Sequence, residues 1–167
     1  DGYPIPLYAK AGLPTDIAAA HAVGAEGIGL YRTEFAFMVR ESFPSEEEQY
    51  QIYRQMLAAL TPRPVVMRTL DIGGDKTLPY FPIEEKNPFL GWRGMRFTLD
   101  HPEIFLTQLR AMLRANAEFN NLRILFPMIT TVEEVEEALR LLDQAHRELR
   151  EDGWPAARPP IGVMIEV

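Results

Sequence analysis

The chain has 167 residues, of which 47% are hydrophobic, and a formal net charge of −7. This length suffices for one domain with a sizeable core, so we expect residues 1–167 to fold as a single domain. The negative charge argues against nucleic-acid and anionic-membrane partners, and neither a membrane span nor a signal peptide is recognisable. The chain has no cysteine, which excludes disulfides, thiolate metal ligands and a cysteine nucleophile within it and favours a cytoplasmic location.

Apolar runs of strand length alternate with segments of helical periodicity along the chain. Such alternation predicts a parallel sheet whose strands are connected by helices. In chain order, the expected elements are a strand at 5–9, a helix at 15–23, a strand at 27–34, a helix at 45–60, a strand at 65–68, a helix from 100 through 113, a strand at 122–128, a helix at 132–151 and a strand at 161–166. Residues 36–44 and the proline-rich stretch after Lys76 are expected to be loops.

Polar residues mark where three of these helices begin. Ser45 and Thr131 are each followed three residues later by a glutamate, which is the pattern of a capping box. Asp100 is expected to cap the helix that starts beside it. Arg110 and Arg114 lie four residues apart in that helix, and we expect both on its solvated face.

Three of the expected strands end in charged residues, which core strands seldom do. Arg32 follows the second strand, Arg68 closes the third and Glu166 closes the fifth. The carboxyl ends of parallel strands share one rim, where the active sites of such folds lie, so we expect these side chains to converge. The stretch from Arg68 to Lys76 adds two glycines and further charges, which suits a bound phosphate or carboxylate. Arg123 instead begins its strand and is expected on the opposite rim.

Two α/β architectures fit this order of elements. The preferred interpretation is a partial (β/α)8 TIM barrel, consisting of the first five strands and their helices. A self-contained, five-stranded doubly wound sheet is the alternative. Because the chain stops one residue after the charged end of its last strand, we expect it to be a fragment of a longer protein, truncated after strand five.

Four segments, in the same order and with the same spacing, resemble a family of phosphoenolpyruvate (PEP)-utilising enzymes. The resemblance is to the PEP-binding domain of enzyme I, the PEP-protein phosphotransferase of the bacterial sugar phosphotransferase system. The segments read GIGLYRTEF at 27–35, RTLDIGGDK at 68–76, NPFLGWR at 87–93 and GVMIE at 162–166. Residues 42–49 and 109–116 are closer to the nitrogen-regulatory paralogue of that enzyme.

The resemblance implies roles for individual residues. The family's arginines that match Arg32, Arg68 and Arg93 bind PEP, and the glutamate that matches Glu166 is a Mg²⁺ ligand. In that family the phosphoryl group passes to a histidine in another domain and then to an HPr-like phosphocarrier protein, which is the implied protein partner. The family's catalytic cysteine would lie beyond residue 167, so we expect no catalytic residue in this chain and no turnover by it alone.

Two other functions stay open. Pyruvate phosphate dikinase and PEP synthase share the Arg-Thr-Glu element of residues 32–34 but differ over residues 71–76, which argues against them. A non-catalytic, self-associating fragment would instead bind no PEP. Detectable binding of PEP therefore separates the two enzyme interpretations from the third.

A barrel cut after its fifth strand leaves two strand edges without a neighbour. The apolar edge at residues 161–167 is suited to pair with another chain, so we expect the isolated chain to self-associate, as a homodimer or a larger species. Sedimentation velocity over a range of concentrations measures this association. A single monomeric species at high concentration contradicts the expectation.

Overall fold

The computed structural model describes residues 8–11, 27–38, 42–71, 95–129 and 131–165. Within these ranges the strands are β1 (Tyr8–Ala11), β2 (Gly27–Arg32), β3 (Val65–Arg68), β4 (Leu122–Ile129) and β5 (Ile161–Ile165). The helices there are α2 (Glu34–Met38), α3 (Glu46–Leu60), α4 (Met95–Asp100), α5 (Pro102–Phe119) and α6 (Val132–Glu151). None of these described helices has the length and hydropathy that crossing a bilayer requires.

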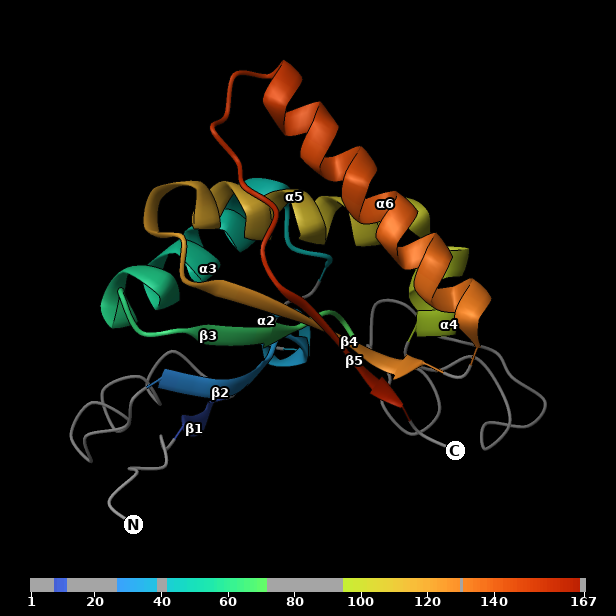
Figure 1. The fold of residues 1–167 in the computed structure, drawn as a ribbon, viewed down its shortest axis with the longest axis horizontal. Coiled ribbons are helices and arrows are strands. Elements are labelled where there is room, and N and C mark those ends of the chain that lie inside the picture. The colour runs from blue at the N-terminus through green and yellow to red at the C-terminus, as the bar shows by residue number, and fades with distance from the viewer. Residues whose placement is uncertain (1–7, 12–26, 39–41, 72–94, 130, 166–167) are drawn as a thin grey trace, which may run out of the picture.

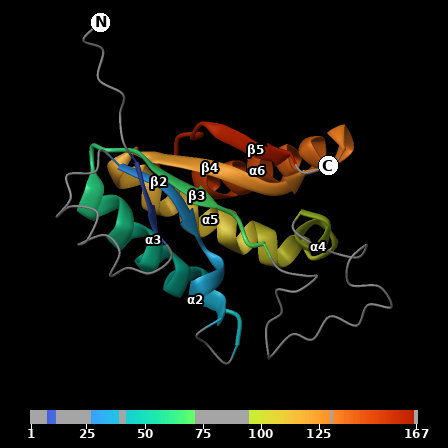
Figure 2. The ribbon, with the colours of Figure 1, turned by 90° about the horizontal axis from the view of Figure 1, so that it is seen from below.

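The described strands form one sheet in the order β1-β2-β3-β4-β5, and every neighbouring pair runs parallel. Figure 1 shows α3, α5 and α6 on the same side of this sheet, and in Figure 2 the strands cross in front of α5. Each successive strand is added beside the previous one, as in the wall of a barrel, whereas a doubly wound sheet reverses its strand order. The arrangement is that of a partial (β/α)8 barrel, as predicted, and does not fit the doubly wound alternative.

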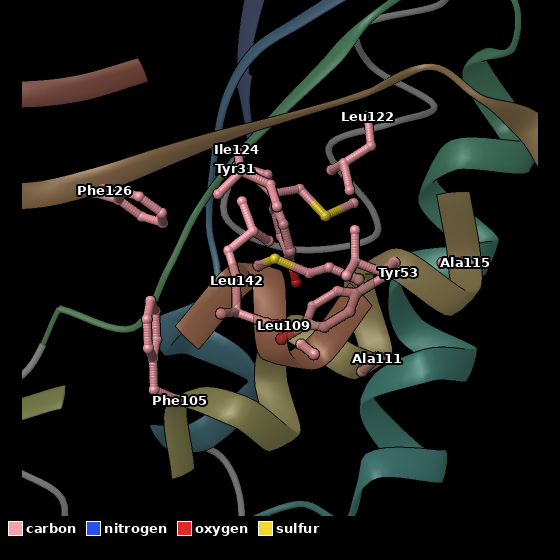
Figure 3. Close-up of a cluster of buried hydrophobic side chains, with 14 of the residues drawn as sticks. Tyr31, Tyr53, Phe105, Leu109, Ala111, Ala115, Leu122, Ile124, Phe126 and Leu142 are labelled. Carbon is pink, nitrogen blue, oxygen red and sulfur yellow. The ribbon is translucent and has the colours of Figure 1, made fainter. Parts of the chain in front are cut away.

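The core lies between the sheet and the helices. Side chains from β2, β3 and β4 meet the apolar faces of α3, α5 and α6 that the helical periodicity predicts (Figure 3). Phe105 of α5 and Phe126 of β4 pack edge to face, with ring centroids 5.9 Å apart. Fully buried members of this core include Tyr31, Met67, Ile124, Tyr53, Leu57, Leu109, Met112 and Leu142. Their burial sets which face of each helix turns toward the sheet, and therefore which residues reach the rim.

Two of the three predicted helix caps are confirmed. The Glu48 amide donates to Ser45 Oγ at 3.1 Å and the Ser45 amide donates to Glu48 Oε1 at 3.4 Å, which completes the capping box of α3. Thr131 Oγ1 accepts from the Glu134 amide at 3.2 Å at the start of α6. The third prediction is wrong: Asp100 ends α4, because a proline, whose φ is fixed for helix entry, starts α5 two residues later.

Three strand ends differ from the prediction; the smallest difference is in β4, which ends at Ile129, one residue later than predicted. The first strand extends to Ala11, two residues beyond the predicted end, and its last two residues pair with Leu30 and Tyr31 of β2; residues 5–7 of the prediction lie outside the described residues. β2 ends at Arg32, two residues before the predicted end, because helix α2 begins at Glu34; α2 then continues to Met38, into residues predicted to be a loop. The helix predicted at 15–23 lies outside the described residues, as does the proline-rich stretch.

Arg110 and Arg114 of α5 do not lie on a solvated face, contrary to the prediction. The Arg114 guanidinium lies 4.2 Å from the ring centroid of Tyr50 and 4.8 Å from that of Trp154. Arg114 also pairs with a Glu46 oxygen at 2.9 Å, and Arg110 pairs with the other oxygen at 2.6 Å. We call these five residues the outer cluster. Its partners come from α3 and from the segment after α6, so the periodicity of α5 alone could not identify them.

The Arg114→Ala variant is expected to lower the free energy of unfolding by about 1–2 kcal/mol, because it removes ring contacts and ion pairs from a side chain that is 12% exposed. Arg140→Ala is the matched control, because Arg140 pairs with Glu137 on α6 but is 61% exposed, and its urea midpoint is expected to stay unchanged. Urea denaturation followed by tryptophan fluorescence measures both variants. Equal shifts in the two would contradict a stabilising role for the outer cluster.

Candidate functional site

The carboxyl ends of β2 and β3 bring two of the predicted site residues together. In the parallel register of these strands, the Cα of Arg32 is the partner of the Cα of Arg68. Each arginine is the last residue of its strand, so both stand at the rim where the strand-end argument expects them. Arg123 is exposed near the amino end of β4, opposite Val66 of β3, and so lies toward the other rim, as predicted.

The other two predicted site residues, Arg93 and Glu166, lie outside the described residues. In sequence, Glu166 directly follows β5, whose carboxyl end shares the rim with β4 because the two strands are parallel. Among the residues that the structure describes, no group of three or more histidine, aspartate or glutamate side chains could hold a metal ion. The structure therefore brings Arg32 and Arg68 together, and the positions of the other two remain predictions.

Arg68 is only 6% exposed, and two buried carboxylates lie beside its guanidinium. A terminal nitrogen of Arg68 donates to Glu34 Oε1, and the same nitrogen lies 3.6 Å from Asp71 Oδ2. Burying a guanidinium costs several kcal/mol unless the charge is paired, so the two acids are needed to stabilise Arg68 inside the protein. Sequence reasoning missed both acids as partners of Arg68, although each lies within three residues of a predicted strand end.

Thr33 connects the two strand ends. Its hydroxyl donates a 2.7 Å hydrogen bond to the backbone carbonyl of Arg68, and both residues are buried. Because Thr33 directly follows Arg32, this bond fixes the backbone beside one arginine against the backbone of the other. The Arg-Thr-Glu element of residues 32–34 therefore supplies a strand-end arginine, a bond between strands and an ion-pair partner for Arg68.

The buried atoms Glu34 Oε2 and Arg68 Nε have no hydrogen-bond partner among the described residues. Protein interiors rarely leave such atoms unsatisfied, so each marks a place where a ligand or another part of the protein completes the bonding. A guanidinium N–H suits an anionic oxygen, and a carboxylate oxygen is the kind of donor that Mg²⁺ prefers. The chemistry of the rim therefore fits an anion accompanied by a hard cation.

Burial raises the pKa of the Glu34 carboxyl above its ordinary value, and the neighbouring Arg68 guanidinium opposes only part of this effect. Asp71 acts in the same direction as burial, because a second carboxylate disfavours ionisation of the first. The charged form of Glu34 is therefore maintained at a free-energy cost, which makes this rim sensitive to pH.

The whole chain, residues 1–167, matches the family described as PEP-utilising enzyme, PEP-binding domain. It is 59% identical over 143 residues to the phosphoenolpyruvate-dependent phosphotransferase system protein of Escherichia coli (strain K12), covering 85% of this chain and 19% of that protein. It is 48% identical over 169 residues to the phosphoenolpyruvate-protein phosphotransferase of Staphylococcus carnosus (strain TM300), covering 100% of this chain and 29% of that protein. The chain thus spans less than a third of the length of these curated relatives.

The raised pKa of Glu34 predicts an effect of pH on folding. A carboxyl whose pKa is higher in the folded state contributes stability below its unfolded pKa of 4.5, and this contribution is lost as the pH rises through the folded value. Glu34→Gln removes the titration. The free energy of unfolding of this variant, minus that of the wild type, is therefore expected to increase as the pH rises above 4.5.

Urea denaturation at intervals from about pH 3 to pH 8 measures this difference. Glu137→Gln is the control of opposite sign: the hydrogen bond from Arg140 lowers the pKa of Glu137, so the corresponding difference is expected to decrease as the pH rises toward 4.5. A Glu34→Gln difference that is flat, or that falls with pH, would show that burial does not dominate the titration of Glu34.

Proposed function

Since this chain belongs to the PEP-binding domain family of the PEP-utilising enzymes, we propose that it is part of the PEP-binding domain of a phosphoenolpyruvate-protein phosphotransferase. The observation that carries this proposal is the pairing of Arg32 with Arg68 at the carboxyl ends of β2 and β3. Relatives with that printed name match the chain over nearly all of its length, which gives the proposal independent support.

The substrate explains why arginines stand at this rim. PEP carries a phosphate and a carboxylate, and planar guanidinium groups bind both kinds of oxyanion bidentately. Arg32, Arg68 and Arg93 are the proposed substrate-binding residues. The Nε–H of Arg68, which has no acceptor among the described residues, is a donor available to such a ligand.

The remaining rim residues bind the metal or orient the arginines. Glu166 is the proposed ligand of Mg²⁺, because that ion prefers hard carboxylate oxygens. When bound, the ion supplies positive charge that offsets the negative charge on the transferred phosphoryl group. Glu34 and Asp71 hold the Arg68 guanidinium in place, and their burial keeps water away from this side of the rim.

The acceptor in this proposal is a histidine in another domain of the full-length protein, from which the phosphoryl group passes to a phosphocarrier protein. Phosphoryl transfer depends mainly on positioning and on stabilisation of charge, so the residues of this chain bind and orient, and none is assigned as catalytic. We expect the chain alone to be inactive, because the acceptor histidine lies in another domain and this chain has no residue assigned as catalytic. PEP is a cytoplasmic metabolite, so the full-length protein is expected in the cytoplasm.

We also propose the nitrogen-regulatory branch of the family for this chain. The support lies in residues 42–49 and 109–116, which carry that resemblance and contact each other: Arg114 pairs with Glu46 at 2.9 Å and with Glu47 at 2.7 Å. These contacts join the two segments between α3 and α5.

The Arg68→Ala variant is expected to weaken PEP binding by about 100-fold, because it removes a buried charged donor from the site. Arg123→Ala is the matched control, because it removes an exposed arginine toward the opposite rim and is expected to leave the Kd within about twofold. Isothermal titration calorimetry of the full-length protein with PEP and Mg²⁺ measures both. Unchanged binding in Arg68→Ala, or an equal loss in Arg123→Ala, would overturn the proposed site.

A further inference from the structure

Gln108, in the first half of α5, is fully buried and bonds to three different segments. Its amide nitrogen donates to Thr33 Oγ1 at 2.9 Å and to the Tyr53 hydroxyl at 3.2 Å. Its Oε1 accepts from the backbone amide of Leu70 at 2.8 Å. One side chain thus connects α5 to the residue after β2, to the chain just after β3 and to α3.

The hydrogen bonds continue from Tyr53 into α3. The Tyr53 hydroxyl donates to Gln49 Oε1 at 3.0 Å, and Gln49 Nε2 donates to the Pro44 carbonyl at 3.0 Å. Tyr53 is itself fully buried among the core side chains (Figure 3). The amide of Gln108 is therefore oriented by a network of buried hydrogen bonds that continues to the amino-terminal end of α3.

The two rim contacts of Gln108 lie next to the two arginines. Thr33 directly follows Arg32, and its hydroxyl donates to the carbonyl of Arg68 at 2.7 Å. Leu70 comes two residues after Arg68, and its backbone amide donates to Gln108 Oε1. Gln108 therefore holds the backbone on the carboxyl side of both arginines.

We propose that Gln108 is a positioning residue for substrate binding, which sets the spacing of Arg32 and Arg68 for a ligand that carries both a phosphate and a carboxylate. This inference rests on the proposed function. An apolar residue cannot replace Gln108, because the site uses two donors and one acceptor from a single side chain. A shift of about 1 Å in a binding group weakens its interactions severely, so the effect of Gln108 reaches the ligand without contact between them.

A purely structural buried amide is the competing explanation, and α5 itself supplies the matched control. Asn116, on the same helix, is buried, and its Oδ1 accepts from the Leu122 amide at 2.9 Å. Leu122 begins β4, so this bond lies at the rim opposite the arginines. Replacing either amide side chain by leucine leaves a buried backbone N–H without its acceptor, and Gln108→Leu also removes the bonds donated to Thr33 and Tyr53.

The experiment compares Gln108→Leu with Asn116→Leu in the full-length protein. Thermal denaturation gives the Tm, calorimetric titration with PEP and Mg²⁺ gives the Kd, and steady-state assays give KM and kcat. Both variants are expected to lower the Tm, and Gln108→Leu by at least as much as Asn116→Leu. Gln108→Leu is expected to raise the Kd and the KM for PEP about tenfold, while Asn116→Leu keeps both within about twofold.

Arg68→Ala, measured in parallel, separates the two proposals. Normal PEP binding in Arg68→Ala overturns the proposed function and with it the role of Gln108. Lost binding in Arg68→Ala, together with equal Kd values in the two amide variants, overturns the role of Gln108 alone.

If Gln108→Leu does not fold, variants of Thr33 provide the same test. Thr33→Val removes the hydroxyl that joins Gln108 to the Arg68 carbonyl, whereas Thr33→Ser retains it. Thr33→Val is expected to raise the Kd for PEP about tenfold, and Thr33→Ser is expected to restore it. Equal affinities in Thr33→Val and the wild type overturn the inference.

Discussion

The burial of Arg68 is the constraint on which the rim of the sheet depends. A guanidinium taken out of water has to be paired, and Glu34 and Asp71 pair with it from the start of α2 and from the chain after β3. Helix α2 must therefore begin directly after β2, and the chain after β3 must stay at the rim. One buried charge thus determines the local path of the chain after β2 and of the chain after β3. The residues that it pairs, Glu34 and Arg68, lie 34 positions apart in sequence.

Helix α5 connects this rim to the rest of the fold. Arg110 and Arg114 join α5 to α3 and to the segment after α6 through the outer cluster, and Phe105 fills the core beneath β4. Gln108 reaches the rim from the same helix. Because one helix serves all three contacts, its position couples the packing of the outer layer to the spacing of the arginines.

Patterns among neighbouring residues in the sequence predicted the helices and strands. Contacts between residues far apart in the sequence account for the features that these patterns missed. The caps at Ser45 and Thr131 and the alternation of strands and helices depend on residues a few positions apart, so the sequence revealed them. Arg114 finds Glu46 at a separation of 68 residues, and Gln108 finds Thr33 at 75, which no local pattern encodes. The available hint was a glutamine within the apolar stripe of α5, a position that needs a buried partner.

The proposed site requires Arg68 to bind PEP while it stays buried beside Glu34. NMR of the arginine side-chain Nε–Hε groups in ¹⁵N-labelled full-length protein tests this most directly, because Arg68 Nε is buried and has no acceptor among the described residues. On titration with PEP and Mg²⁺, we expect the Arg68 signal to shift and saturate while the Arg123 signal stays in place. A saturating ligand that leaves the Arg68 signal unchanged would contradict the claim.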